Sequence, residues 1–185
     1  ILELGLKKAN DWRERMGRER NADWDRMADQ MAPWPVVNGV YVEAESVLEK
    51  DGGHPTQLAA YGFLPASAYL DKEVMRKTLR HVLDNWDWAD TWGWDFPLIA
   101  MTAIRLNEPE WALEALLKSV QKNTYLPNGH NFQNEGLPLY LPGNGGLLTV
   151  VAMMCAGWDG CTEGNPGFPK NGQWNVKWEG LKPAL

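Results

Sequence analysis

Three strongly apolar segments alternate with two amphipathic segments between residues 52 and 156, and this order limits the possible folds more than any other feature of the chain. The apolar segments, near 58–63, 97–106 and 147–156, carry almost no charge, whereas 71–86 and 109–120 place apolar side chains on one helical stripe. A helix that is apolar all round belongs inside, and a helix with a polar face belongs outside. The pattern predicts an all-α fold with two layers of helices joined by short links. An (α/α)6 toroid, present here as about three helical hairpins, satisfies this order, and an irregular α bundle is the alternative.

Local signals predict where individual elements begin. Asp71 can cap the amphipathic helix that follows it, and Pro97 is suited to the first turn of the central apolar helix. Residues 2–16 have helical spacing, and Asn21 or Asp23 can start a second helical piece. The β-like run at 36–43 contains Asn38-Gly39 and predicts a small hairpin. A length of 185 residues suits one domain, so residues 1–185 are predicted to form a single domain.

Composition argues against several classes of partner. The chain has 18 Lys+Arg against 24 Asp+Glu, a net charge of −6 and no basic run, so nucleic acid is not an expected partner. The longest apolar stretch, 147–156, is about half of the roughly 20 residues that cross a bilayer, so no membrane span is predicted. Two cysteines and three histidines show no metal-ligand spacing, so neither a metal nor another cofactor is predicted.

Tryptophan is unusually frequent, with 11 residues in the chain. Four of them, Trp86, Trp88, Trp92 and Trp94, fall within nine residues. Large flat rings with a polar edge suit both a packed aromatic corner and a platform that stacks against a sugar ring. Both interpretations of this cluster remain open from the sequence.

The loops that precede the three apolar helices are rich in Gly, Trp, His and Asn. These loops are 52–54, 92–95 and 128–146. If the three helices run parallel, the loops meet on one rim, where helix N-termini favour oxygen-rich or anionic groups. This rim is the candidate site.

Three stretches in the same chain order resemble the six-hairpin glycosidases, most closely glycoside hydrolase family 95, the α-L-fucosidase-like enzymes. His54-Pro55-Thr56-Gln57-Leu58-Ala59-Ala60-Tyr61-Gly62-Phe63-Leu64-Pro65 is similar to their "HLYGLYP" turn. Residues 92–106 are similar to their "GWS…ARL" helix, and Gly143-Asn144-Gly145-Gly146 is similar to their "GN-GG" segment. The resemblance covers about residues 33–158.

The resemblance implies an (α/α)6 barrel that hydrolyses glycosidic bonds of oligo- or polysaccharides with inversion, by means of two carboxyl groups. A complete barrel has six hairpins, so the chain is expected to be the C-terminal portion of the barrel, with a missing N-terminal half as its partner and carbohydrate as its substrate. Periplasmic or extracellular localisation is expected on the same basis. A phosphorylase of the same superfamily, with phosphate near the Gly-rich helix start, and a non-catalytic carbohydrate-binding domain are the alternatives.

The catalytic residues do not transfer directly from the family. The base Asp of the family precedes the Gly-Asn pair, where this chain has Pro142. Asp95, at the start of an apolar helix, is the first carboxylate candidate, and a helix cap is its alternative role. Glu43 lies in the region of the family's "LQEW"-like element and is the second candidate, with a solvated strand end as its alternative. Glu135 is a third carboxylate, with simple exposure as its alternative.

The predicted substrate-binding residues carry amide, imidazole and indole groups, which hydrogen-bond hydroxyls in both directions. The loop 128–135 supplies three of them, although Asn and Gly in such a loop also suit tight turns. The imidazole of the 54–65 turn can contact a ligand or make a structural hydrogen bond. The full set is His54, Trp92, Trp94, His130, Asn131, Gln133 and Asn144.

Overall fold

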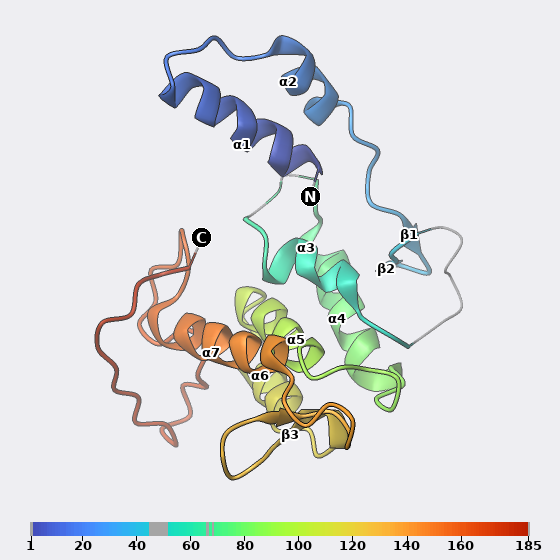
Figure 1. Ribbon diagram of the computed structural model, residues 1–185, viewed down its shortest axis with the longest axis vertical. Helices are drawn as coiled ribbons and strands as arrows, with labels where there is room; N and C mark the ends of the chain where they lie inside the picture. The colour runs from blue at the N-terminus through green and yellow to red at the C-terminus, as the bar shows by residue number, and fades with distance from the viewer. Residues whose placement is uncertain (1, 45–51, 66, 68, 185) are drawn as a thin grey trace. The chain divides into compact units, whose positions relative to one another are not determined.

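The computed structural model describes residues 2–44, 52–65, 67 and 69–184, which group into two compact units, Ile1–Trp34 and Pro35–Leu185. The described residues form seven α-helices and two small antiparallel hairpins (Figure 1). The predicted helical class is therefore confirmed. The single-domain assignment of 1–185 stays a prediction.

The first unit is a helical hairpin of α1 (Leu2–Arg15) and α2 (Ala22–Asp29). Asn21 caps α2, because its side-chain oxygen accepts hydrogen bonds from the backbone N–H groups of Asp23 and Trp24. The buried Asn10 side chain bonds both the N–H and the C=O of Asn21. These bonds fix the turn, and they confirm Asn21 as the start of the second helix.

The second unit begins with the predicted hairpin, in which β1 (Val36–Val37) pairs with β2 (Val40–Tyr41). Asn38 and Gly39 have φ values of 51° and 82°, which a type I′ turn requires at both central positions. Tyr41 attaches the hairpin to the helix that follows, since its N–H donates to Thr78 Oγ1 over 2.8 Å and its hydroxyl accepts from the N–H of Asp71.

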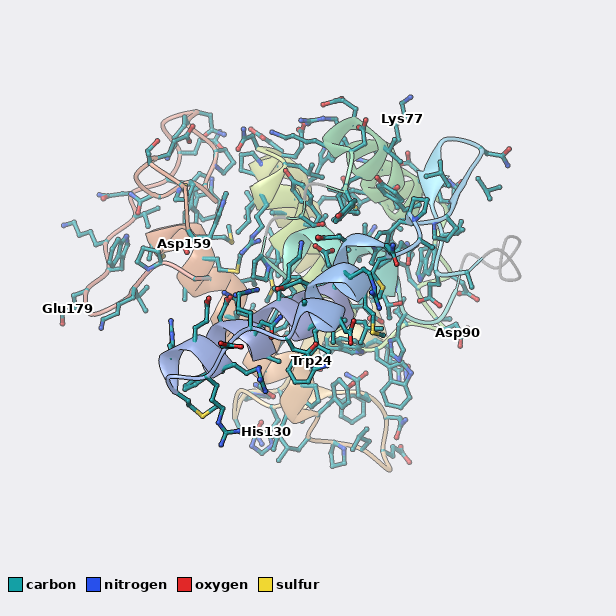
Figure 2. All side chains as sticks on the ribbon, turned by 90° about the horizontal axis from the view of Figure 1, so that it is seen from above. Trp24, Lys77, Asp90, His130, Asp159 and Glu179 are labelled. Carbon is teal, nitrogen blue, oxygen red and sulfur yellow. The ribbon has the colours of Figure 1, made fainter. Side chains whose placement is uncertain are left out.

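Helix α4 (Lys72–Asn85) is amphipathic, as predicted. The Asp71 carboxylate accepts hydrogen bonds from the N–H groups of Glu73 and Val74 and so caps the helix. One face is buried, and Lys77 on the opposite face lies at the outer edge of this unit (Figure 2). The buried side chains are Met75, Thr78, Leu79, Val82 and Leu83.

Helix α5 (Asp95–Arg105) is the core of the second unit. Ten of its 11 residues are buried, which confirms the prediction that this helix is buried on nearly all sides. It begins at Asp95, two residues before the predicted start at Pro97. It contacts α3 (Ala59–Gly62), α4, α6 (Pro109–Leu116) and α7 (Leu141–Ala156), which surround it in Figure 1.

Two predictions about helix bounds were wrong. Helix α6 ends at Leu116 and not near 120, because the chain turns there into the 3-10 helix η3 (Gln121–Asn123) through a turn held by Asn123. Helix α7 begins at Leu141 and not near 147, with Pro142 in its first turn, so the Gly-rich segment lies inside the helix.

Helix α7 also differs from the prediction that it is buried all round. Val150, Met153 and Met154 are buried, whereas Leu141 and Leu148 on another face are 67% and 73% exposed. Composition could not distinguish these faces because both are apolar. An uncovered apolar face on an inner-type helix is a surface suited to further packing.

The remaining elements connect these helices. The short 3-10 helix η2 (Thr56–Leu58) leads into α3, and β3 (Thr124–Tyr125) pairs with β4 (Asn131–Phe132) between η3 and α7. Residues 157–184 return to the end of α7, where Ala184 bonds Gly157 and Asp159. Within the described ranges, no helix is both long enough and apolar enough to cross a membrane.

Candidate functional site

Side-chain contacts bring together the three loops that precede α3, α5 and α7. His54 contacts Asp95, and Trp86 Nε1 donates to the C=O of Gly53 over 3.0 Å. The N–H of Gly93 donates to Gln133 Oε1 over 2.9 Å. These contacts join residues far apart in the chain and form the rim that the sequence predicts.

Asp95 is fully buried in this rim, and its carboxylate points back toward the preceding turn. Both carboxylate oxygens lie 3.1 Å from His54 Nδ1, and Oδ2 accepts a hydrogen bond from the N–H of Trp92 over 2.7 Å. Trp94 is the N-cap residue of α5, and no side chain caps this helix. The capping alternative for Asp95 was therefore wrong, because its carboxylate bonds Trp92, which lies before the N-cap residue, and His54 of a neighbouring loop.

The environment of Asp95 changes its acidity. Burial raises the pKa of Asp95 to about 6, while the N–H of Trp92 and the nearby His54 act in the opposite direction. Above about pH 6 the carboxylate is ionised and can only accept hydrogen bonds. The indole N–H of Trp94 also points at this His54 nitrogen, with Nε1 3.0 Å from Nδ1.

Aromatic rings frame this pair. The His54 ring centroid lies 5.0 Å from that of Trp94 and 6.4 Å from that of Trp92, and Trp92 lies 5.5 Å from Tyr140. We refer to His54, Trp92, Trp94, Asp95 and Tyr140 as the His54 cluster. The His54 side chain is 37% exposed, whereas that of Asp95 is fully buried. The cluster therefore has a buried carboxyl group beneath an accessible imidazole ring.

Two members of this surface were not predicted from the sequence. Burial raises the pKa of Tyr140, and the charge of Asp95 raises it further, so the phenol lies within the field of the carboxylate. The Lys122 ammonium lies 4.7 Å from the centroid of Trp92 as a cation–π contact. The only sequence signals were an aromatic residue at the start of an apolar helix and a cation near the polar loop.

Asn131 and Gln133, both predicted to bind substrate, are fully buried and bonded to protein. The Gln133 amide accepts from Gly93 and donates to Lys122 O and Asn131 Oδ1. The Asn131 amide donates to the C=O groups of Lys122 and Thr124. Their hydrogen-bonding groups are therefore used to hold the loop against the His54 cluster.

Two glycines make room for this amide network. A Cβ atom at Gly93 would lie 1.8 Å from Asn131 Oδ1, and one at Gly143 would lie 2.1 Å from the same atom. Asn144 belongs to the network as well, because its side chain accepts from the N–H of Asn131 and donates to Gly129 O. The glycines thus allow the loops 92–95 and 128–146 to approach closely around one amide.

Three further candidate residues from the sequence, Glu43, His130 and Glu135, make no hydrogen bond or ring contact with the His54 cluster within the described residues. Glu43 is exposed and accepts a hydrogen bond from the Thr56 hydroxyl, two residues after His54. The backbone N–H of His130 donates to Asn128 Oδ1, and no hydrogen bond or ring contact joins its imidazole to the cluster among the described residues. Glu135 is exposed in the bend that follows β4.

Gln57, in η2 beside His54, is a further polar residue that the sequence did not indicate. It is buried, and its Oε1 atom has no hydrogen-bond partner within the described part of the chain. Burying an amide oxygen without a hydrogen-bond partner lowers the free energy of unfolding, so the effect of replacing Gln57 on stability is a useful test.

The chemistry available here is proton exchange, hydrogen bonding and ring stacking. The described residues contain no group of three or more His, Cys, Asp or Glu side chains that could hold a metal ion. Comparisons with protein-family models, with curated proteins and with solved structures find no match.

Proposed function

We propose that this chain is part of a six-hairpin glycoside hydrolase and that the His54 cluster forms part of its sugar site. One observation supports the proposal above all. A half-exposed imidazole, tied to a buried carboxyl group, lies among Trp92, Trp94 and Tyr140. Aromatic faces and two-way hydrogen-bonding groups are what a sugar ring requires for stacking and hydroxyl recognition.

The order of helix contacts supports an (α/α) toroid. Helix α5 contacts α3 and α7, each two helices away in the chain, and also contacts its chain neighbours α4 and α6. An inner row of α3, α5 and α7 with α4 and α6 outside has these contacts. The exposed face of α7, with Leu141 and Leu148, is where we place the remaining hairpins, so the N-terminal half of the barrel is the proposed partner.

The proposed reaction is hydrolysis with inversion of oligo- or polysaccharide substrates, outside the cytoplasm. Asp95 and Glu43 are the carboxyl candidates from the sequence, and inverting enzymes hold such a pair about 6.5–9.5 Å apart. Asp95 is fully buried, so any part that it has in the reaction passes through a neighbouring group. Glu43 is linked through Thr56 to the segment that carries His54, which favours its placement on the same rim.

The phosphorylase alternative loses its structural argument. It relied on a helix that starts near Asn144, but α7 starts at Leu141 and the Asn144 side chain bonds Asn131 and Gly129. A non-catalytic carbohydrate-binding domain remains as one outcome of the test below.

The test compares the wild-type protein with Trp92→Ala, and with Trp174→Ala as the matched control. Trp174 is a partly exposed tryptophan of the C-terminal segment, where it packs on Phe168. Sugar binding is measured by calorimetry against a panel of oligosaccharides, and turnover is measured with aryl glycosides in the complete natural polypeptide, with and without phosphate. We expect Trp92→Ala to weaken sugar binding at least about tenfold and Trp174→Ala to leave it unchanged.

The outcomes separate the candidate functions. Turnover without phosphate that falls in Trp92→Ala supports hydrolysis at this site, and turnover that needs phosphate favours a phosphorylase. Saturable binding without turnover favours a carbohydrate-binding domain. Absence of both binding and turnover across the panel, or equal losses in the two variants, contradicts a sugar site at the His54 cluster.

A further inference from the structure

The burial of Asp95 determines how this carboxyl group can take part in chemistry. The residue is fully buried, and its oxygens face His54 Nδ1 and the N–H of Trp92. A group without accessible surface does not touch a ligand in this arrangement. Any effect of Asp95 on a ligand must therefore pass through a neighbouring group, and His54 is the side chain that both its oxygens face.

His54 has the complementary arrangement. Its Nδ1 atom faces the carboxylate, whereas its Nε2 atom has no hydrogen-bond partner among residues 2–44, 52–65, 67 and 69–184. The ring is 37% exposed between Trp92 and Trp94. In a neutral imidazole one nitrogen carries the proton and the other carries a lone pair, so the partner of Nδ1 decides which form meets a ligand.

We propose that Nε2 of His54 accepts a proton from a sugar hydroxyl or from water at this site, and that Asp95 is a positioning residue that keeps the ring proton on Nδ1. This inference rests on the proposed function. The glycosidase family that the chain resembles has its catalytic base Asp at the position of Pro142, and the inference assigns the base role to His54 instead. In the transfer, the proton moves from the hydroxyl oxygen to Nε2 and the electron pair of the O–H bond stays on the oxygen. The imidazolium that forms is stabilised by the adjacent carboxylate.

Trp94 competes for the same nitrogen. Its Nε1 atom lies 3.0 Å from His54 Nδ1, and a single ring nitrogen cannot both donate to Asp95 and accept from an indole N–H. An ionised carboxylate forms a charge-assisted hydrogen bond, which is roughly twice as strong as a neutral one, so Nδ1 donates to Asp95. The indole N–H of Trp94 then gives up its hydrogen bond to Nδ1.

Several ionisable groups surround this ring and contribute to any pH profile. Asp95 comes from α5, Tyr140 precedes α7, and Lys122 of η3 lies over Trp92. Glu43 follows β2 and is bonded to Thr56 of η2. A pH profile must therefore be compared between variants of one residue, and it is combined below with a direct measurement of the ring proton.

The first measurement determines the tautomer of His54 by nitrogen-15 NMR of the imidazole rings at pH 8. Only three histidines are present, and the His54→Gln variant assigns the signals. We expect a protonated Nδ1 and an unprotonated Nε2 in the wild-type protein. We expect Asp95→Asn to lose this preference, because an amide can donate to Nδ1, and Asp95→Glu to retain it. His81 and His130 serve as internal controls.

The NMR result tests the inference without any substrate. A wild-type His54 ring with its proton on Nε2 overturns the inference, whether or not the variants fold. An unchanged tautomer in a folded Asp95→Asn protein overturns the positioning role of Asp95.

The second measurement uses turnover on the best glycoside of the panel. We expect His54→Gln to lower kcat by roughly 10²–10⁴-fold and Asp95→Asn to lower it by roughly 10–100-fold with a changed pH profile. Asp95→Glu should restore part of the loss. Turnover that is unaffected by His54→Gln overturns the inference and leaves the hydrolase proposal intact. The expected tautomer with no turnover on any sugar refutes the hydrolase proposal and the proton transfer that rests on it.

Discussion

The replacement Asp95→Asn gives a quantitative test of the buried carboxyl group. Asp95 holds its proton more tightly in the folded protein than in the unfolded chain, because burial raises its pKa from 3.8 to about 6. The folded state therefore binds more protons between about pH 4 and pH 6, and stability falls as pH rises through this window. The whole shift corresponds to about 3 kcal/mol. This contribution is fully present below pH 3.8 and is lost above about pH 6.

Asparagine has nearly the same shape and does not titrate, so Asp95→Asn should lack this loss. We expect the unfolding free energy of the variant, relative to the wild-type protein, to rise by about 2 kcal/mol between pH 4 and pH 7. Urea unfolding followed by circular dichroism at several pH values measures the difference. Glu135→Gln removes a carboxylate from an exposed loop and is the matched control, which should follow the wild-type curve.

A flat difference between Asp95→Asn and wild type over this pH range would falsify the argument, because it would mean that the carboxyl group is hydrated in the folded protein. A difference of the opposite sign would mean that hydrogen bonds to the ionised form exceed the effect of burial. The flat difference would also weaken the assignment of the Nδ1 proton of His54, whereas the opposite sign would agree with a donor at Nδ1.

Three further predictions concern packing. Gly143→Ala should destabilise the protein by roughly 1–3 kcal/mol, because its Cβ would lie 2.1 Å from Asn131 Oδ1, whereas Gly145→Ala has open space and should be neutral or stabilising in chemical denaturation. Gln57→Met should be neutral or stabilising in the same assay, because it removes a buried oxygen without a partner in the described structure, and a clear destabilisation would show that this oxygen is bonded in solution. Leu148 is 73% exposed on the apolar face of α7, so Leu148→Lys should reduce apolar-dye binding and self-association of the isolated chain. Its stability should change by no more than about 0.5 kcal/mol. An unchanged dye signal would show that the dye binds to another surface.

Features with a local physical cause could be predicted from the sequence. The caps at Asn21 and Asp71 need only a side-chain oxygen next to free N–H groups, and the hairpin at Asn38-Gly39 needs only residues that accept a positive φ. The inner position of α5 follows from a composition with almost no polar side chain. Convergence of the loops at one rim followed from the order of these helices.

The start of α7 could not be predicted in this way. Three glycines between 143 and 146 disfavour a helix by local propensity, yet the helix includes them. The reason is tertiary: a Cβ at Gly146 would lie 3.0 Å from Pro97 of α5, and one at Gly143 would strike Asn131. Close packing of α7 on its neighbours selects glycine there and overrides the propensity.

The role of the polar loop depends on the same close approach. Asn131 and Gln133 have the groups that bind sugars, and the sequence alone slightly favours a binding role over a structural one. The structure uses both amides internally, because Gly93 and Gly143 leave space that the Asn131 amide occupies and the Gln133 amide nitrogen lies against Gly93 as well. A ligand at this rim therefore meets the surface that the amides support, and the exposed imidazole of His54 is the group there with a free lone pair for proton transfer once Asp95 holds the other ring nitrogen.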